Sequence, residues 1–327
     1  MTSKRERSKA VRRLRLLVVL AVAYVFGVVG YYFLPWQIRQ GVYKVSPGLN
    51  RVLRRQGFKL VEGWDGLGLW GRDCRTTLSG GGGEHGYGGT PSQGLKMLDR
   101  VKILENESYI VGYSESMKNP LWVAYRVFDV PSLESGERPS RFRIDHRTEA
   151  KVSHSAYRGS GYDRGHMAPN FAIATRYGMN GQWETFLMSN IIPQTPSVNR
   201  HIWKDLEQYV ARRYGRYFGE VWVITGPVFT EPVKRFGSGV SIPSGYYKIL
   251  VDEDGDEVRV LAFLIESRCP PYTRIKSRLV SVDEIEMRTG LNFFPDLAET
   301  AQADLEAQSA GRLWPWLMPA IRYDLHL

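Results

Sequence analysis

The stretch YRGSGYDRGHMAPN, residues 157–170, carries the most concentrated chemistry in the chain. Its centre, Asp163-Arg164-Gly165-His166, places an acid, a permanent cation, a flexible glycine and an imidazole in four consecutive positions. A neutral histidine can accept a proton from water, and arginine is a bidentate donor to phosphate. Asp163 is expected to orient the arginine or the neighbouring backbone. The alternative is a surface turn with an Asp–Arg pair, which explains the charges but not the histidine.

A second polar group lies in the run MSNIIPQTPSVNRHIWKDLE, residues 188–207. Asn199, Trp203 and Glu207 are spaced i, i+4 and i+8, so on a helix they project along one face. An amide oxygen and a carboxylate two turns apart suit Mg²⁺, which prefers oxygen ligands and keeps most of its waters. Neutral asparagine would hold the ion without cancelling its charge. Alternatively, Asn199 is the helix N-cap and Glu207 a solvated helix residue, and spacing alone leaves both interpretations open.

The sequence around these groups predicts a mixed α+β domain. A helical pattern runs from Asn199 to Phe218, with an apolar residue near every fourth position. DEDGDE at 252–257 is interpreted as a hairpin turn, because it lacks the spacing, glycine and closing glutamate of a calcium loop. Strand patterns rich in β-branched and aromatic residues lie at 108–130, 219–229, 246–251 and 258–267.

The N-terminal sequence predicts a membrane anchor. Residues 16–36 contain no charge, and a helix of that length spans about 30 Å, the thickness of a bilayer's hydrocarbon core. Basic residues within 1–15 favour a cytoplasmic N-terminus, and Tyr31, Tyr32 and Trp36 suit an interfacial aromatic belt. The rest of the chain would then lie on the periplasmic or another extracytoplasmic side. A cleaved signal peptide is the alternative, although no convincing small-residue cleavage site follows.

Residues 37–94 are predicted to form a basic and glycine-rich linker. The run LSGGGGEHGYGGTP at 78–91 is interpreted as a flexible tether or loop, since no Gly-Lys-Ser/Thr follows it as in a phosphate-binding loop. The domain of interest is expected at 95–300, with a C-terminal extension at 301–327. Cys74 and Cys269 are too few for a disulfide framework, so they either form one long-range disulfide or remain free thiols.

Taken together, the two polar groups resemble those of the DNA/RNA non-specific endonucleases, a family with a ββα-metal, or His-Me finger, fold. Asp163–His166 matches the family's DRGH motif, and YRGSGYDRGHMAP resembles its endonuclease G type. The resemblance covers about residues 95–297 and implies an α+β nuclease domain with a central mixed or antiparallel sheet, preceded by one transmembrane helix. Other similar stretches, in the same order, are LWVAYRV, MSNIIPQTPSVNRHIWKDLE, VWVITGPVF, IPSGYYKILV and VDEIEMRTGLNFFPDL.

The resemblance implies a role for each matching residue. His166 matches the general base, Asn199 the direct metal ligand and Glu207 the residue that holds the metal's waters. Arg164 matches the motif arginine near the phosphate, and Asp163 precedes it. The supporting positions are Asn190, Gln194 and Trp203, and the candidate substrate-binding arginines are Arg141 and Arg158.

The implied reaction is magnesium-dependent hydrolysis of DNA and RNA to 5′-phosphate and 3′-hydroxyl ends, with Mn²⁺ as a substitute ion. Little sequence preference is expected, because backbone contacts carry no direct base information. The formal charge of +10 suits a polyanionic partner, and the endonuclease G type implies a homodimer. Two alternatives are an anchored nucleic-acid-binding module, for instance in DNA uptake, and a phosphodiesterase with a non-nucleic substrate. The presence of His166, Asn199 and Glu207 favours the nuclease.

Overall fold

The computed structural model divides the chain into two compact units, residues 1–70 with 315–327, and residues 71–314. Most of the predicted linker before residue 74, the predicted domain start at Leu95 and the last part of the predicted extension lie outside the described residues. The residues described are 2–34, 41–42, 44–46, 48–50, 52–53, 56, 74–77, 80–94, 100–237, 239–254 and 257–314.

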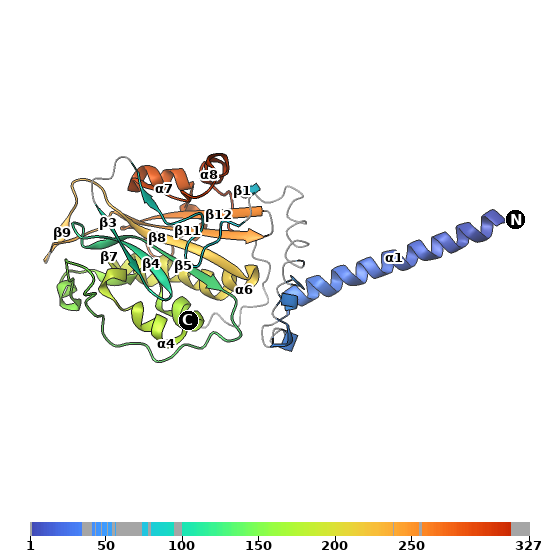
Figure 1. The fold of residues 1–327 in the computed structure, drawn as a ribbon, viewed down its shortest axis with the longest axis horizontal. Coiled ribbons are helices and arrows are strands. Elements are labelled where there is room, and N and C mark those ends of the chain that lie inside the picture. The colour runs from blue at the N-terminus through green and yellow to red at the C-terminus, as the bar shows by residue number, and fades with distance from the viewer. Residues whose placement is uncertain are drawn as a thin grey trace. The chain divides into compact units, whose positions relative to one another are not determined.

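The larger unit is built on an eight-stranded antiparallel sheet (Figure 1). Along the sheet the strand order is β1-β12-β11-β8-β5-β4-β3, and β13 pairs with β12. This confirms the predicted α+β class, the central sheet and the four predicted strand regions. The strands are β1 (Cys74–Thr77), β3 (Val101–Glu105), β4 (Tyr109–Ser114), β5 (Asn119–Phe128), β8 (Glu220–Val228), β11 (Gly245–Asp254), β12 (Glu257–Glu266) and β13 (Leu279–Val280).

Two further predictions, the hairpin at 252–257 and the state of the cysteines, can be compared with the structure. Asp254 pairs with Glu257, so β11 and β12 pair as a hairpin at the position that the sequence predicted. Cys269, which follows β12, is a buried free thiol, whereas only the backbone of Cys74 is described. Of the two alternatives for the cysteines, the structure therefore has the free thiol at Cys269.

The side chains of the sheet alternate between two faces, as the pleat of a strand requires. Trp122, Trp222 and Ile249 belong to a large apolar core that also contains Ile285 and Leu305 from the helices α7 and α8. Tyr246 and Lys248 point to the other face, where both lie against Trp203. The layer containing Trp203 carries the candidate site. The helices α7 (Val282–Thr289), α8 (Glu299–Glu306) and α4 (Asn170–Glu184), with the short 3-10 helices η1 (His154–Tyr157), η2 (Met188–Asn190) and η5 (Ile275–Arg278), lie outside the sheet.

The predicted helix at 199–218 is confirmed, although it mixes α-helical and π-helical turns. Its four segments follow one another without a break from residue 198 to residue 218. They are η3 (Val198–Trp203), α5 (Lys204–Tyr209), η4 (Val210–Tyr214) and α6 (Gly215–Phe218).

The glycine run is part of the folded domain and is not a tether. Its Tyr87 is fully buried in the core against Trp222, whose indole nitrogen donates to Gly83 O at 2.8 Å. A Cβ on Gly82 would lie 2.4 Å from the Trp222 ring, so the glycine allows the backbone to pass over this side chain. Composition alone suggested flexibility, but these glycines permit close packing. Past the run, β2 (Ser92–Gln93) pairs with β14 (Leu291–Asn292).

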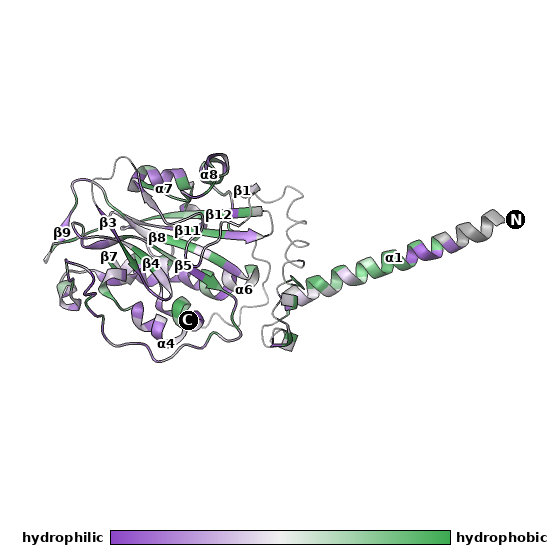
Figure 2. Cartoon of the chain, in the orientation of Figure 1, coloured by the Kyte–Doolittle hydropathy of each residue, from purple (hydrophilic) through white to green (hydrophobic). Residues whose placement is uncertain are grey.

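The smaller unit contains α1 (Thr2–Phe33). Residues 11–31 of this helix have a mean hydropathy of 2.2 and only 6% of the apolar window is buried, and Figure 2 shows the apolar residues along it. By length and composition α1 can cross a membrane, and a signal sequence near the N-terminus meets the same criteria.

Candidate active site

The motif Asp163-Arg164-Gly165-His166 forms a strand, which is one part of a small arrangement of two strands and a helix. β6 (Asp163–His166) pairs with β7 (Ile191–Gln194) in an antiparallel two-stranded sheet, separate from the main sheet. The helical run from residue 198 follows β7 directly. Gly165 lies against Gln194, since a Cβ at this position would be 2.1 Å from Gln194 Oε1. The motif therefore needs glycine at this position because any side chain would clash with Gln194. This requirement adds to the flexibility inferred from the sequence.

His166 ends β6 and packs against two phenylalanine rings that also contact each other, with centroids 5.0 Å apart. The ring centroids of Phe142 and Phe186 are 5.2 and 5.1 Å from that of the imidazole. Nε2 is buried and has no hydrogen-bond partner among the described residues. Burial, with a smaller contribution from the cation of Arg138, lowers the pKa of His166 to about 3. The imidazole is therefore neutral at physiological pH, which is the protonation state that a general base requires.

Asn190 fixes the backbone immediately after His166. This fully buried residue accepts from Ala168 N at 2.8 Å through Oδ1 and donates to Ala168 O at 3.0 Å through Nδ2. Its own carbonyl accepts from Met167 N at 3.0 Å. These three bonds explain in physical terms the supporting position expected for Asn190. Gln194, the other expected support, is fully buried, and neither of its side-chain polar atoms has a partner among the described residues.

Asp163 connects β6 to the start of the helical run. Its Oδ2 accepts from Asn199 Nδ2 at 3.0 Å and from Arg200 Nε at 2.8 Å, and its Oδ1 accepts from Arg200 Nη2 at 2.7 Å. The bonds from Arg200, followed by that from Asn199, lower the pKa of Asp163. The carboxylate thus pairs with Arg200 and not with the adjacent Arg164 that the sequence suggested.

The same contact bears on the two interpretations of Asn199. The helical run begins at Val198, so Asn199 lies inside its first turn, and the N-cap position belongs to Ser197. With its amide nitrogen bonded to Asp163, Asn199 is left with its side-chain oxygen for a cation. The geometry disfavours the N-cap and fits the metal ligand.

Glu207 lies two turns further on and is not the solvated residue of the alternative interpretation. One carboxylate oxygen, Oε1, is buried and has no hydrogen-bond partner among the described residues. Burial raises the pKa of Glu207, while the cation of Lys248 and the indole of Trp203 oppose that rise. Lys248 is itself fully buried, with Nζ 4.4 Å from the centroid of the Trp203 ring.

The arginines divide into three groups. Arg164 donates from Nε and Nη2 to His154 O at 3.2 and 2.7 Å, so this edge of its guanidinium is occupied by the protein. Arg141 and Arg158 are exposed, and their cations add to burial and to Arg164 in lowering the pKa of His154. Arg138, which the sequence reasoning missed, acts on both His166 and Glu207 and lies 5.5 Å from the ring of Phe186. Arg138 lies in an irregular loop outside both motifs, so no regular spacing in the sequence pointed to it.

The donor set fits a hard divalent cation. An asparagine oxygen and a buried carboxylate oxygen without a protein partner are the ligand types that Mg²⁺ takes, directly or through its waters. His166 is connected to Asn199 through β6, whose Asp163 accepts a hydrogen bond from Asn199 Nδ2. The cation of Arg138 adds to the lowering of the pKa of His166 and opposes the rise in the pKa of Glu207.

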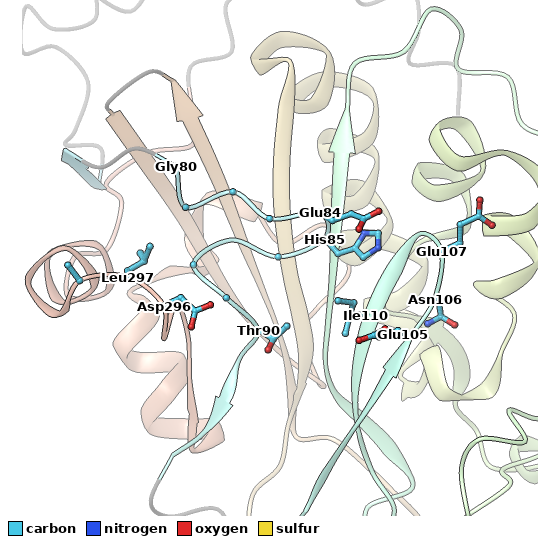
Figure 3. A pocket seen from close by; sticks show the side chains of 17 residues that line it. Gly80, Glu84, His85, Thr90, Glu105, Asn106, Glu107, Ile110, Asp296 and Leu297 are labelled. Atoms are coloured by element: carbon cyan, nitrogen blue, oxygen red, sulfur yellow. The ribbon is translucent and has the colours of Figure 1, made fainter.

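A cavity of about 820 Å³ lies elsewhere in the same unit (Figure 3). The glycine run and the β3–β4 turn line it, with the side chains of Glu84, His85, Glu105 and Asn106 among those labelled. None of the predicted site residues lines this cavity. Its carboxylates repel phosphate, which disfavours this cavity as a nucleic-acid site.

Comparisons with known proteins agree with the family resemblance found in the sequence. Residues 88–300 match the family of DNA/RNA non-specific endonucleases. Human mitochondrial endonuclease G is 30% identical over 237 residues, which is 67% of this chain and 77% of that protein. A nuclease from Nostoc sp. is 32% identical over 235 residues, or 68% of this chain and 82% of that protein.

Solved structures agree with this match. A chain in the crystal structure of the EndoG/EndoGI complex superposes with a TM-score of 0.55 at 27% sequence identity. The match covers 63% of this chain and 89% of that one. The likeness therefore extends to the fold of most of the larger unit.

Proposed function

Because the chain belongs to the DNA/RNA non-specific endonuclease family and is a metal-dependent endonuclease, we propose that it cleaves both DNA and RNA with His166 as general base. The observation that carries this proposal is the neutral His166 on strand β6, whose Asp163 accepts a hydrogen bond from Asn199. Asn199 would hold Mg²⁺, or Mn²⁺ as a substitute, and Glu207 would accept hydrogen bonds from the ion's waters.

In the proposed reaction, the neutral imidazole of His166 takes a proton from the attacking water, which displaces the 3′-oxygen and leaves a 5′-phosphate end. When bound, the metal supplies positive charge for the phosphate oxygens and the leaving oxygen. Arg138 would supply further positive charge, since its guanidinium lies 5.5 Å from the ring of Phe186, which packs on His166, and its cation acts on the pKa of both His166 and Glu207. We therefore assign to Arg138 a role in stabilising the transition state, and keep the candidate substrate-binding residues Arg141 and Arg158 as outer contacts for the nucleic-acid backbone.

The proposal extends to location and assembly. We place the nuclease domain on the extracytoplasmic side of a membrane, anchored by α1, with the basic N-terminus in the cytoplasm. This orientation keeps the enzyme away from the genome of its own cell. A homodimer is the proposed assembly.

The test is cleavage of supercoiled plasmid and of RNA by the full-length protein in detergent, with Mg²⁺ or with a chelator. We expect nicking of both polymers, loss of nicking with chelator, and a loss of kcat by a factor of about 10² or more in His166→Ala. His154→Ala is the matched control, because His154 also stacks on Phe142, at 5.8 Å. Tight binding without cleavage would indicate the binding module, and cleavage of small diesters alone would indicate the phosphodiesterase.

A further inference from the structure

Asp145 is a buried carboxylate in the loop between β5 and η1, with 3% of its surface exposed. Its Oδ1 accepts from the backbone nitrogen of Arg147 at 3.0 Å and from Nε of Arg147 at 2.9 Å. Its Oδ2 accepts from Arg147 Nη2 at 2.7 Å and from Ser189 Oγ at 2.6 Å. Burial alone would raise the pKa of Asp145, but the bonds from Arg147 and Ser189 outweigh burial and lower it. The carboxylate is therefore ionised and holds four donors.

One of those donors leads to the general base. Ser189 is almost fully buried and is followed by Asn190, whose three hydrogen bonds hold Met167 and Ala168. Met167 and Ala168 are the first two residues after His166. A continuous series of bonds thus joins Asp145 to the turn that orients the imidazole.

The other donor leads to the main sheet. Arg147 donates to Glu105 O at 2.7 Å and to Asn106 Oδ1 at 2.8 Å, both at the turn between β3 and β4. Within the part of the chain that the structure describes, β6 pairs with β7 alone, in a sheet of its own, so the placement of His166 relative to the main sheet depends on contacts outside the strand ladders. The bonds of Asp145 supply such a connection, from the β3–β4 turn through Arg147 to Ser189.

We propose that Asp145 is a positioning residue for the nuclease reaction, which clamps Ser189 and Arg147 so that Asn190 holds the backbone after His166 in its productive orientation. This inference rests on the proposed function, because it assigns to Asp145 the orientation of the base that the function requires. Asp145 does not touch the reacting atoms and leaves the metal ligands to Asn199 and Glu207.

The experiment compares two buried hydroxyl groups that donate to Asp145 in the full-length protein in detergent. Ser189→Ala removes the bond to the carboxylate, and Thr148→Val removes the 2.8 Å bond from Thr148 Oγ1 to the carbonyl of Asp145, which does not lead to Asn190. We expect Ser189→Ala to lower kcat by about 10- to 100-fold, with KM and the Mg²⁺ dependence unchanged, because a displaced base loses alignment. Thr148→Val should keep kcat within about twofold at a similar loss of stability. Asp145→Asn should reproduce the effect of Ser189→Ala.

A spectroscopic readout separates this inference from the proposed function. In protein labelled with ¹⁵N-histidine, the imidazole signals of His166, identified by their absence in His166→Gln, should move in Ser189→Ala and stay in place in Thr148→Val. If the wild type cleaves neither polymer, the proposed function fails and these signals still decide the positioning. Equal kcat losses in the two variants, or unchanged kcat and imidazole signals in Ser189→Ala, would overturn the role of Asp145.

Discussion

Burial shifts the two ionisable groups at the site in opposite directions, because in each case it disfavours the charged form. The imidazole of His166 is kept neutral far below its ordinary pKa of 6.5, so its protonation does not limit the reaction near neutral pH. The pKa of Glu207 is raised above its ordinary 4.5, against the opposing charge of Lys248. As the pH falls, the group at the site that is protonated first is therefore Glu207 and not the general base His166.

We expect the affinity for Mg²⁺ to weaken as the pH falls through the raised pKa of Glu207, since a protonated carboxyl accepts hydrogen bonds from metal waters less well. Titration calorimetry from pH 8 to pH 5 measures this dependence. In Glu207→Gln the affinity should be lower and nearly independent of pH over the same range. A wild-type affinity that stays constant down to pH 5 would contradict the role of Glu207.

The close contact between Gly165 and Gln194 can be tested by mutation. Gly165→Ala places a methyl group within 2.1 Å of Gln194 Oε1, so β6 and β7 must separate or the glutamine must move. We expect a loss of about 1–3 kcal/mol in the free energy of unfolding, measured by urea titration, and reduced nicking activity. The double variant Gly165→Ala/Gln194→Ala removes the clash and should recover part of the lost stability. Equal stability of the single and double variants would show that the steric argument is wrong.

The glycine run packs on the core of the larger unit through its one aromatic residue. Its Tyr87 ring packs edge to face on Trp222 and Phe294, with centroid distances of 5.3 and 6.3 Å. The backbone after Tyr87 bonds Asp296 through Gly88 O, which accepts from Asp296 N at 3.0 Å. The run thus joins the N-terminal part of the domain to the segment before α8.

Tyr87→Ala tests whether this element contributes to the core. Removing a fully buried aromatic side chain leaves a cavity, so we expect the free energy of unfolding to fall by about 3–5 kcal/mol in thermal or urea unfolding. Tyr272→Ala is the control, because Tyr272 is 86% exposed and its removal should cost less than about 0.5 kcal/mol. A flexible tether would instead give two variants of equal stability.

The elements also show what a sequence can and cannot predict. The strands β5, β8, β11 and β12 could be predicted because they repeat apolar residues over many positions. The four-residue strand β6 has no such pattern, since its residues were selected for chemistry, and its pairing with β7 depends on contacts distant in the sequence. The link from Asp145 to Ser189 spans 44 positions and is invisible to local spacing for the same reason.

For the whole molecule, the formal charge of +10 and the apolar helix α1 are the two global properties that bear on where the enzyme works. The positive charge favours association with nucleic acid, and this attraction weakens as salt screens it. The helix decides whether the enzyme meets its substrate at a membrane or free in solution. An anchor and a cleaved signal sequence make different predictions for the mature protein, so the two can be separated directly.

We expect an uncleaved anchor, so the protein should remain in the membrane pellet after an alkaline carbonate wash and keep its full mass of 37.3 kDa by mass spectrometry. Leu20→Arg puts a charge in the apolar segment, which disfavours insertion by about 2.5–3.5 kcal/mol near a helix centre, and should release part of the protein from the pellet. Leu49→Arg, at an exposed position outside the segment, is the control and should leave the distribution unchanged. A shorter protein recovered in the soluble extracytoplasmic fraction would instead identify α1 as a signal sequence, and the nuclease would then act away from the membrane.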